Sequence, residues 1–373
     1  MKKTLLALAL GGLLILSACG DKNIKSNKIE ENNKKVSTEN INKDAIKYDL
    51  GFYGTFDTYV EIAIYSDDED FAKENLEYAK MRFEDLHKLF DNYKNYTGIA
   101  NVKSINDNAG IKPTVVNDTL FKLIKDSVDD YKNISHKTNI ALGPVTKIWN
   151  DYRDLYDSGK TKEEVIKLKG EAIPSDAELE KLRPLTNMNN IILNEENNSV
   201  EIGKGMALDL GSTAKGFATE LVARELEERG VKSAVISAGG NVRIIGKPLD
   251  GRDNFRIGIQ NPEVENGEDT ICVVNVVGTS VVTSGDYQRY FTVDGVRYCH
   301  IIDPDTLKPS NNLKSVTIIK GDSGLCDFLS TAAFNSSDDE IKYLAEKTDS
   351  AIIWVDKDMN IKATESANRF IDN

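Results

Sequence analysis

The residues of this chain whose types and spacing could do chemistry gather in polar, glycine-rich regions of its second half. These regions are 209–216 (DLGSTAKG), the pair 237–241 (SAGGN) and 283–287 (TSGDY), and the pair 300–304 (HIIDP) and 326–331 (CDFLST). The first is a turn that feeds a helix, where free N–H groups and the positive dipole end favour an anion such as phosphate. Ordinary strand–turn–helix joints share this pattern, so on its own it indicates a phosphate site only weakly.

Asp327 and Thr331 are the residues with metal-binding potential. They are four positions apart, which places both side chains on one face of a helix. A carboxylate and a hydroxyl there could hold a hard cation such as Mg²⁺, with carbonyls, water or substrate phosphates completing its octahedron. Taken alone, the pair is more typical of an ordinary helix start with an acid in its first turn.

Other catalytic chemistries find little support in the sequence. The three histidines, His87, His136 and His300, are scattered without the spacing of a zinc site. Cys299 and His300 are adjacent in an expected strand, so their side chains point to opposite faces, which disfavours a Cys–His dyad. Apart from Cys19, three cysteines remain, Cys272, Cys299 and Cys326, an odd and sparse set that is not a disulfide framework but leaves room for one bridge, which the sequence does not assign.

The hydrophobic patterns around these regions predict a mixture of helices and strands. Helices are expected at 70–90, 116–131, 212–229 and 324–334. Strands are expected at 58–65, 191–193, 199–202, 233–237, 241–245, 255–259, 271–277, 281–283, 289–293 and 316–320. Because the two kinds of element do not alternate strictly, the fold class is α+β. We expect one large unit over 48–373, with the charged stretch 151–184 as an insertion.

The first 47 residues are expected to lie outside this unit. Residues 1–18 are typical of a lipoprotein signal peptide, because two lysines and a short apolar run precede Leu16-Ser-Ala-Cys19, which resembles a lipobox. Cys19 would then carry the lipid, and the alternative is an ordinary secretory signal with an incidental cysteine. Residues 19–47 are rich in Lys, Asn, Glu and Ser, a composition that predicts a flexible tether. The expected location is the extracytoplasmic face of the cell membrane.

The composition excludes some partners. The formal net charge of the 373 residues is −13, which disfavours binding to nucleic acid or to anionic lipid through charge. Hydrophobic residues make up 40% of the chain, which suffices for a core.

Taken together and in order, the motifs resemble the bacterial FAD:protein FMN transferase family, the ApbE-like lipoproteins. The likeness runs from about Gly54 to the C-terminus. Its motifs are Gly54-Thr55, 89–93 (LFDNY), 142–144 (LGP) with Trp149, 209–218 (DLGSTAKGFA), 238–241 (AGGN), 256–259 (RIGI) with 261–262 (NP), 283–287, 300–304, and Asp327 with Thr331. Each motif is weak by itself, whereas the ordered set is specific.

The resemblance implies transfer of FMN from FAD to a threonine hydroxyl of an exported protein, with release of AMP. It implies Mg²⁺ ligands at Asp327, Ser330 and Thr331 and at a backbone oxygen near Ser212. His300 would be the catalytic base, or would orient the acceptor threonine, while Asp327 would act through the metal. Residues at positions where the family contacts FAD are Tyr53, Tyr93, Lys137, Thr138, Asn139, Asp209, Lys215 and Ile302.

The sequence departs from the family pattern at two places. Asn139 stands where the family often has Asp, a change that bears on FAD affinity or on charge at the metal. Leu307 follows Thr306 where many members have Gly, which alters a turn. Two other functions remain open at this point: an FAD pyrophosphatase that gives FMN and AMP, and a non-catalytic lipoprotein that binds flavin or another small solute.

Overall fold

The centre of the molecule is an antiparallel sheet of eight strands in the order β1–β2–β6–β7–β10–β15–β16–β17. The computed structural model describes residues 45–263 and 269–372. The strands of this sheet are β1 (Ile46–Thr55), β2 (Thr58–Ser66), β6 (Ala234–Ala238), β7 (Asn241–Ile245), β10 (Ser280–Gly285), β15 (Leu313–Lys320), β16 (Ala351–Asp356) and β17 (Ile361–Ala363).

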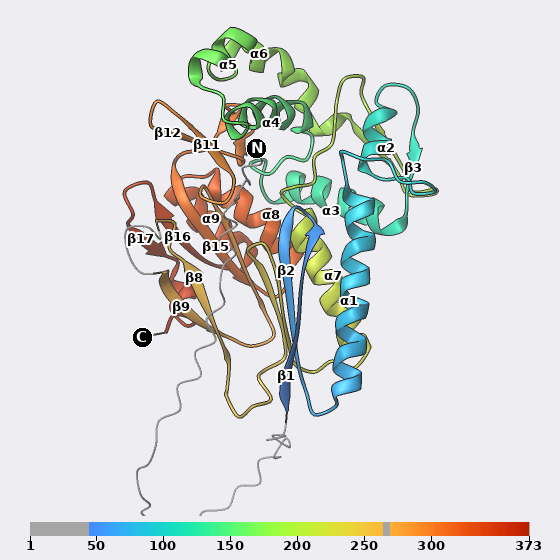
Figure 1. The fold of residues 1–373 in the computed structure, drawn as a ribbon, viewed down its shortest axis with the longest axis vertical. Helices are drawn as coiled ribbons and strands as arrows, with labels where there is room; N and C mark the ends of the chain where they lie inside the picture. The colour runs from blue at the N-terminus through green and yellow to red at the C-terminus, as the bar shows by residue number, and fades with distance from the viewer. Residues whose placement is uncertain (1–44, 264–268, 373) are drawn as a thin grey trace, which may run out of the picture.

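Helices cover one face of the sheet, and a hairpin covers part of the other (Figure 1). The covering helices are α1 (Glu69–Phe90), α7 (Ala214–Glu228), α8 (Ser323–Phe334) and α9 (Asp338–Thr348). One core cluster joins α1 and α7 to β2 and β6, and a second joins α8 and α9 to β15 and β16. The hairpin of β8 (Phe255–Gln260) and β9 (Thr270–Val276) packs against the opposite face.

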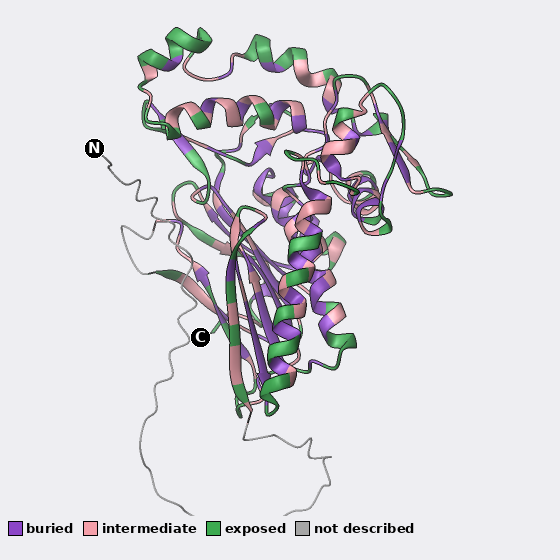
Figure 2. Ribbon diagram, turned by 45° about the vertical axis from the view of Figure 1, so that its right-hand side comes forward, coloured by how far each residue is buried: buried purple, intermediate pink, exposed green. Residues whose placement is uncertain are grey.

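A second group of elements lies across one end of the sheet, at the top of Figure 1. It contains α2 (Val102–Asp107), β3 (Thr114–Val115), α3 (Asp118–Asn133), α4 (Gly143–Asp157), α5 (Lys162–Lys169), α6 (Asp176–Leu182), β4 (Ile191–Asn194) and β5 (Ser199–Ile202). Helices α4 to α6 share an apolar cluster with β11 (Tyr290–Val293), β13 (Ile302–Asp303) and the segment before β14 (Lys308–Pro309). Strand β11 forms a hairpin with β12 (Val296–Cys299). Figure 2 shows the outer surfaces of α5 and α6 largely exposed, whereas α2 and α3 pack into the core cluster that contains β2 and β6.

The α+β prediction is confirmed, and so are the helices expected at 212–229 and 324–334, which are α7 and α8. The expected end of the tether at residue 47 is wrong, because Ile46 and Lys47 already pair with Ser66 and Tyr65 in the β1–β2 ladder. The expected insertion 151–184 begins in the middle of α4, which lines the pocket described below with Thr146, Trp149, Asn150 and Arg153.

The N-terminal predictions lie outside the described residues. These are the signal peptide at 1–18, the lipidated Cys19, and the tether up to residue 44. Among the helices at 45–263 and 269–372, none has the length and apolar character needed to cross a membrane.

Candidate active site

Helices α7 and α8 meet at Asp327, the carboxylate predicted to bind metal. Asp322 caps α8 by accepting a hydrogen bond from Leu325 N–H (2.9 Å), and Asp327 follows at the next turn. Its Oδ2 accepts a hydrogen bond from the Gly216 N–H of α7 (2.8 Å). A Cβ atom at position 216 would lie 2.3 Å from Ser323 O and 2.4 Å from Asp327 Cβ. Only glycine therefore lets the two helices approach this closely.

The surroundings of Asp327 already stabilise a cation. Burial raises the pKa of the Asp327 carboxyl group, and this effect is opposed by Lys215, by the Gly216 N–H and by the Asn241 side chain. The Lys215 ammonium lies 3.9 Å from Asp327 Oδ1 and donates a hydrogen bond to the Gly211 carbonyl (3.2 Å). A positive charge thus sits between a buried carboxylate and a backbone oxygen of the turn before α7.

The side-chain and backbone oxygens expected to bind metal near Asp327 differ in whether they already form hydrogen bonds. Thr331 is half-buried, and its hydroxyl has no hydrogen-bond partner among the residues that the structure describes. The Ser330 hydroxyl is fully buried; it donates to Asp327 O (2.9 Å) and lies 2.8 Å from Ser284 Oγ. Ser212 is half-buried in the turn that precedes α7.

This donor set fits a hard divalent cation. It offers one carboxylate oxygen beside Lys215, a free hydroxyl at Thr331 and backbone carbonyls of the turn at 211–212, all of them oxygen ligands. Asn241 Oδ1 is a buried acceptor next to Asp327 without a partner in the described part of the chain. Mg²⁺ normally takes one or two carboxylates and fills its octahedron with water and phosphate oxygens, so a single aspartate is enough.

His300 is held in one orientation by the β11–β12 hairpin. The pairing of Tyr290 with Cys299 places Arg289 and His300 opposite each other at the open end of the hairpin. The Arg289 carbonyl accepts from His300 N–H (3.0 Å) and lies 3.3 Å from the imidazole Nδ1. A neutral imidazole in this position donates from Nδ1, which leaves the Nε2 lone pair free to accept a proton.

Positive charge surrounds His300. Burial, followed by the charges of Lys215 and Arg289, lowers the pKa of the imidazole well below its usual range, although His300 as a residue is exposed and lines the pocket. His300 is therefore neutral at pH 7. Since Lys215 also acts on Asp327, the expected base and the expected metal ligand share one cationic neighbour.

Asp209 and Tyr93 form another side of the site. Asp209 Oδ2 accepts from the Thr146 hydroxyl (2.7 Å), and its Oδ1 accepts from Gly211 N–H (2.9 Å), so it fixes the turn before α7 against α4. The Tyr93 ring is exposed (65%) and is therefore free to stack on a ligand. Surrounding protein and the negative charges of Asp209 and Asp57 raise the pKa of Tyr93, so these three side chains are electrostatic neighbours.

A pocket opens beside His300, between α4 and the β11–β12 hairpin. Its lining residues are Thr146, Trp149, Asn150, Arg153, Phe291, Tyr298, Cys299, His300 and Ile302. The pocket includes two of the predicted site residues, His300 and Ile302. Its aromatic wall is ordered, because Trp149 stacks on Tyr298 with ring centroids 5.7 Å apart.

Two of the predicted FAD contacts at 137–139 have structural side-chain partners. Thr138 Oγ1 donates to the Phe328 carbonyl of α8 (2.8 Å). Asn139 Nδ2 donates to Thr186 O (2.9 Å), while its Oδ1 accepts from Ala141 N–H (2.7 Å). An aspartate could not make the first of these Asn139 bonds, which gives the departure at this position a local structural reason. Contact of this segment with FAD stays a prediction.

Lys137 and Tyr53 are more accessible. Lys137 forms ion pairs with Asp305 (2.6 Å) and Asp303 (3.9 Å) in the segment that follows His300. Tyr53 is 68% exposed in β1, and its ring packs against Tyr59 with centroids 4.7 Å apart. Their roles in binding FAD remain predictions.

The sequence-based reasoning missed several residues of the site. Arg289 donates to Asp57 O (2.6 Å) and so ties the β1–β2 turn to the carbonyl that holds His300. Thr146 and Arg153 line the pocket from α4. Arg289 lies two residues after the TSGDY motif, and Trp149 of α4 belongs to another predicted motif, but neither pattern marks Arg289, Thr146 or Arg153 as site residues.

Comparisons with known proteins identify related chains. The ApbE family matches residues 56–354. The FAD:protein FMN transferase of Klebsiella pneumoniae is 32% identical over 303 residues, which cover 80% of this chain and 86% of that protein. The FAD:protein FMN transferase of Treponema pallidum is 33% identical over 243 residues, covering 62% of this chain and 63% of that protein.

Solved structures show the same fold. The crystal structure of the ApbE protein of Thermotoga maritima superposes with a TM-score of 0.75 at 26% identity, covering 88% of this chain and 100% of that one. The flavin transferase ApbE of Vibrio cholerae gives a TM-score of 0.70 at 22% identity, with 87% and 100% covered, which supports the fold alone. From the extent of the family match and the 32% identity over four-fifths of its length, this chain belongs to the ApbE family.

Proposed function

We propose that this protein transfers FMN from FAD to a threonine hydroxyl of an exported protein and releases AMP, with Mg²⁺ as the metal. The names of the related Klebsiella pneumoniae and Treponema pallidum transferases give the donor and the transferred group. The observation that carries the proposal is the arrangement around Lys215, which places a neutral imidazole and a buried carboxylate within reach of one positive charge.

The residues divide the work as follows. The threonine Oγ attacks the FMN phosphorus while the bond from that phosphorus to the AMP oxygen breaks, so AMP is the leaving group. His300 Nε2 takes the proton of the hydroxyl. The Lys215 ammonium binds the negative pyrophosphate, and Tyr93 stacks on a ring of FAD. Mg²⁺ held by Asp327, Thr331 and a turn carbonyl would supply charge neutralisation at the pyrophosphate.

Substrate binding would adjust the base. In the free protein, burial and then the charges of Lys215 and Arg289 hold the pKa of His300 below the range of an effective base. The negative pyrophosphate of FAD neutralises Lys215 and Arg289, so the pKa of His300 rises toward the working pH when FAD is bound. The imidazole is therefore a stronger base in the complex than in the free protein.

Intact mass after incubation with FAD, Mg²⁺ and an exported protein carrying a threonine-containing acceptor motif tests the proposal. We expect the acceptor to gain one FMN, and the gain to disappear with EDTA or in a His300→Ala variant. If a known family member labels the same acceptor and this chain only releases FMN and AMP, the function is that of a pyrophosphatase. Bound but uncleaved FAD would indicate a binding protein.

The cellular location is a separate part of the proposal. The lipobox-like segment supports lipid attachment at Cys19 and a place on the extracytoplasmic face of the membrane. Replacement of Cys19 by Ser should move the protein from the membrane fraction to the soluble extracytoplasmic fraction. An unchanged membrane fraction would contradict lipid anchoring at this residue.

A further inference from the structure

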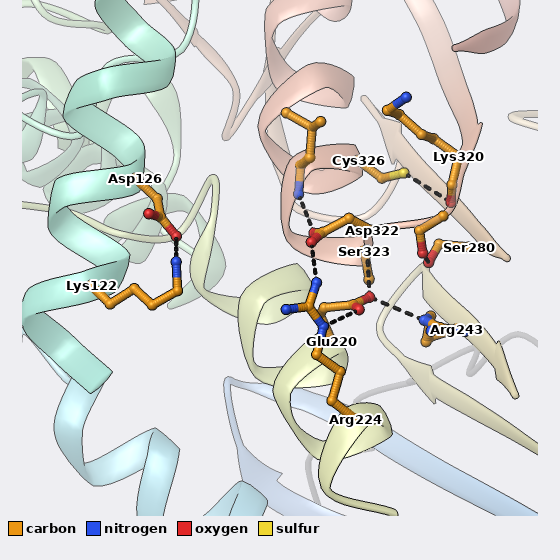
Figure 3. Close-up of polar contacts among 12 residues, drawn as sticks. Lys122, Asp126, Glu220, Arg224, Arg243, Ser280, Lys320, Asp322, Ser323 and Cys326 are labelled. Atoms are coloured by element: carbon orange, nitrogen blue, oxygen red, sulfur yellow. Dashed lines mark hydrogen bonds and ion pairs between the residues drawn. The ribbon is translucent and has the colours of Figure 1, made fainter. Parts of the chain in front are cut away.

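Helices α7 and α8 each supply a carboxylate to the N-terminus of the other. Asp327 of α8 accepts from the N–H of Gly216, the third residue of α7. Glu220 of α7 accepts through Oε2 from the N–H of Ser323, the first residue of α8 (2.9 Å). Figure 3 shows the second contact, with Glu220 pointing at the start of α8 beside Asp322. The exchange leaves Thr213, the N-cap residue of α7, without a side-chain capping bond of its own.

The two contacts form a matched pair. Gly216 and Glu220 are four residues apart on α7, and Ser323 and Asp327 are four apart on α8. Four residues of α-helix span about 6 Å, so the two bonds have equal spacing on both helices and hold them in a single register. A shift of α8 along α7 would break both bonds at once, and it would carry Asp327 and Thr331 away from Lys215.

Glu220 is itself fixed in place. Its side chain is only 9% exposed, and its Oε2 accepts from Arg243 Nε of β7 (3.0 Å). Its Oε1 accepts from Arg224 Nε (2.8 Å), and Arg224 also binds Asp322, the N-cap of α8 (2.7 Å). Both carboxylates at the start of α8 are thereby joined through Arg224 (Figure 3). The ion pairs with Arg243 and Arg224 offset the cost of burying the Glu220 carboxylate.

We propose that Glu220 is a positioning residue that sets the metal affinity of the site by fixing the register of α8, although it does not touch metal or substrate itself. This inference rests on the proposed function, because it takes the oxygens of Asp327 and Thr331 as metal ligands. Groups that hold metal ligands in place typically change metal affinity about 10–100-fold when removed.

Three substitutions separate positioning from general stabilisation. Glu220→Ala removes the acceptor for Ser323 N–H, whereas Glu220→Gln keeps an acceptor oxygen there and loses the charge. Ser323→Pro removes the N–H and keeps Glu220; proline is tolerated at the first helical position, and the extended Asp322 (φ −90°, ψ 117°) suits a following proline. The Ser323 hydroxyl is buried without a partner in the described chain, so its loss breaks no bond there.

Glu225→Ala is the matched control. Glu225 lies on the same helix and accepts from Arg82 and Tyr78 of α1, so its loss removes comparable bonds without touching α8. Binding of Mn²⁺ to the purified, metal-free chain is followed by electron paramagnetic resonance, which reports affinity independently of turnover. The KM for FAD and kcat are measured on the same preparations.

We expect Glu220→Ala and Ser323→Pro to weaken Mn²⁺ binding about tenfold, while Glu220→Gln and Glu225→Ala stay within about threefold of the unaltered chain. Normal Mn²⁺ affinity in both Glu220→Ala and Ser323→Pro would overturn the inference. An equal loss in Glu220→Gln would overturn its basis in the Ser323 hydrogen bond. If the unaltered chain binds no Mn²⁺, the metal assignment in the proposed function fails instead.

Discussion

Replacing Asp327 by Asn should separate the metal-binding charge from the fold. The asparagine keeps an oxygen that accepts the Gly216 N–H, so α7 and α8 retain their contact. The hydrogen bond loses its charge assistance, worth about 1 kcal/mol, and the loss is offset because a buried carboxylate no longer needs neutralising. We therefore expect the free energy of unfolding of the metal-free variant to lie within about 1 kcal/mol of that of the unaltered chain.

The response to Mg²⁺ is the discriminating measurement. A ligand at 100 times its Kd stabilises the folded state by about 2.7 kcal/mol, which raises the Tm of a domain of this size by about 4 °C. Thermal melts with and without Mg²⁺ should show this rise in the unaltered chain and none in Asp327→Asn. An equal rise in both proteins would refute the assignment of Asp327 as the metal ligand.

The pH dependence of the same melts gives an independent check. Burial raises the pKa of Asp327, so the folded state binds its proton more tightly than the unfolded state does. This group therefore lowers stability as pH rises from the ordinary carboxyl pKa to the raised one, in the absence of metal. The Asp327→Asn variant should lack this decrease in stability. If the variant and the unaltered chain gave identical profiles of stability against pH without metal, the raised pKa of Asp327 would be contradicted.

Three other outcomes are expected. FAD binding should move the imidazole titration of His300, followed by NMR, to higher pH, and an unchanged titration would contradict the role of the pyrophosphate. Gly216→Ala should lower the free energy of unfolding, measured with urea, by about 1–3 kcal/mol, because the alanine Cβ would meet Ser323 O. Gly321→Ala should leave it unchanged, because a Cβ there has no atom within 4 Å. Burial and neighbouring acids raise the pKa of Asp130 to about 6, so stability should fall as pH rises from about 4 to 6, and Asp130→Asn should flatten that part of the profile.

The helices that carry the site were the easiest to predict. Helix α7 was expected at 212–229 and spans Ala214–Glu228, and α8 was expected at 324–334 and spans Ser323–Phe334. Their apolar stripes and end signals are local, so a short window of sequence contains them. The pairing of Asp327 with Thr331 on one helix face follows from the same periodicity.

Elements stabilised by distant partners were missed or shortened. Most residues of β1 are not buried, so it lacks a clear alternating pattern, and it is a strand because its backbone pairs with β2. The contact of Asp327 with Gly216 joins residues 111 positions apart, and no local pattern encodes it. The surroundings of His300 depend on the register of the β11–β12 hairpin, which brings in the Arg289 carbonyl.

Lys215 explains why these separate parts make one site. Its ammonium opposes the raised pKa of Asp327 and at the same time lowers the pKa of His300. With Mg²⁺ held by Asp327 and Thr331, Lys215 would be available to bind the pyrophosphate, whose negative charge would oppose the positive charge around His300. The expected metal site at Asp327, the pyrophosphate of FAD and the base His300 would thus be linked through the charge of Lys215. A hydroxyl that reaches His300 before FAD is therefore expected to meet a weaker base than the one in the FAD complex.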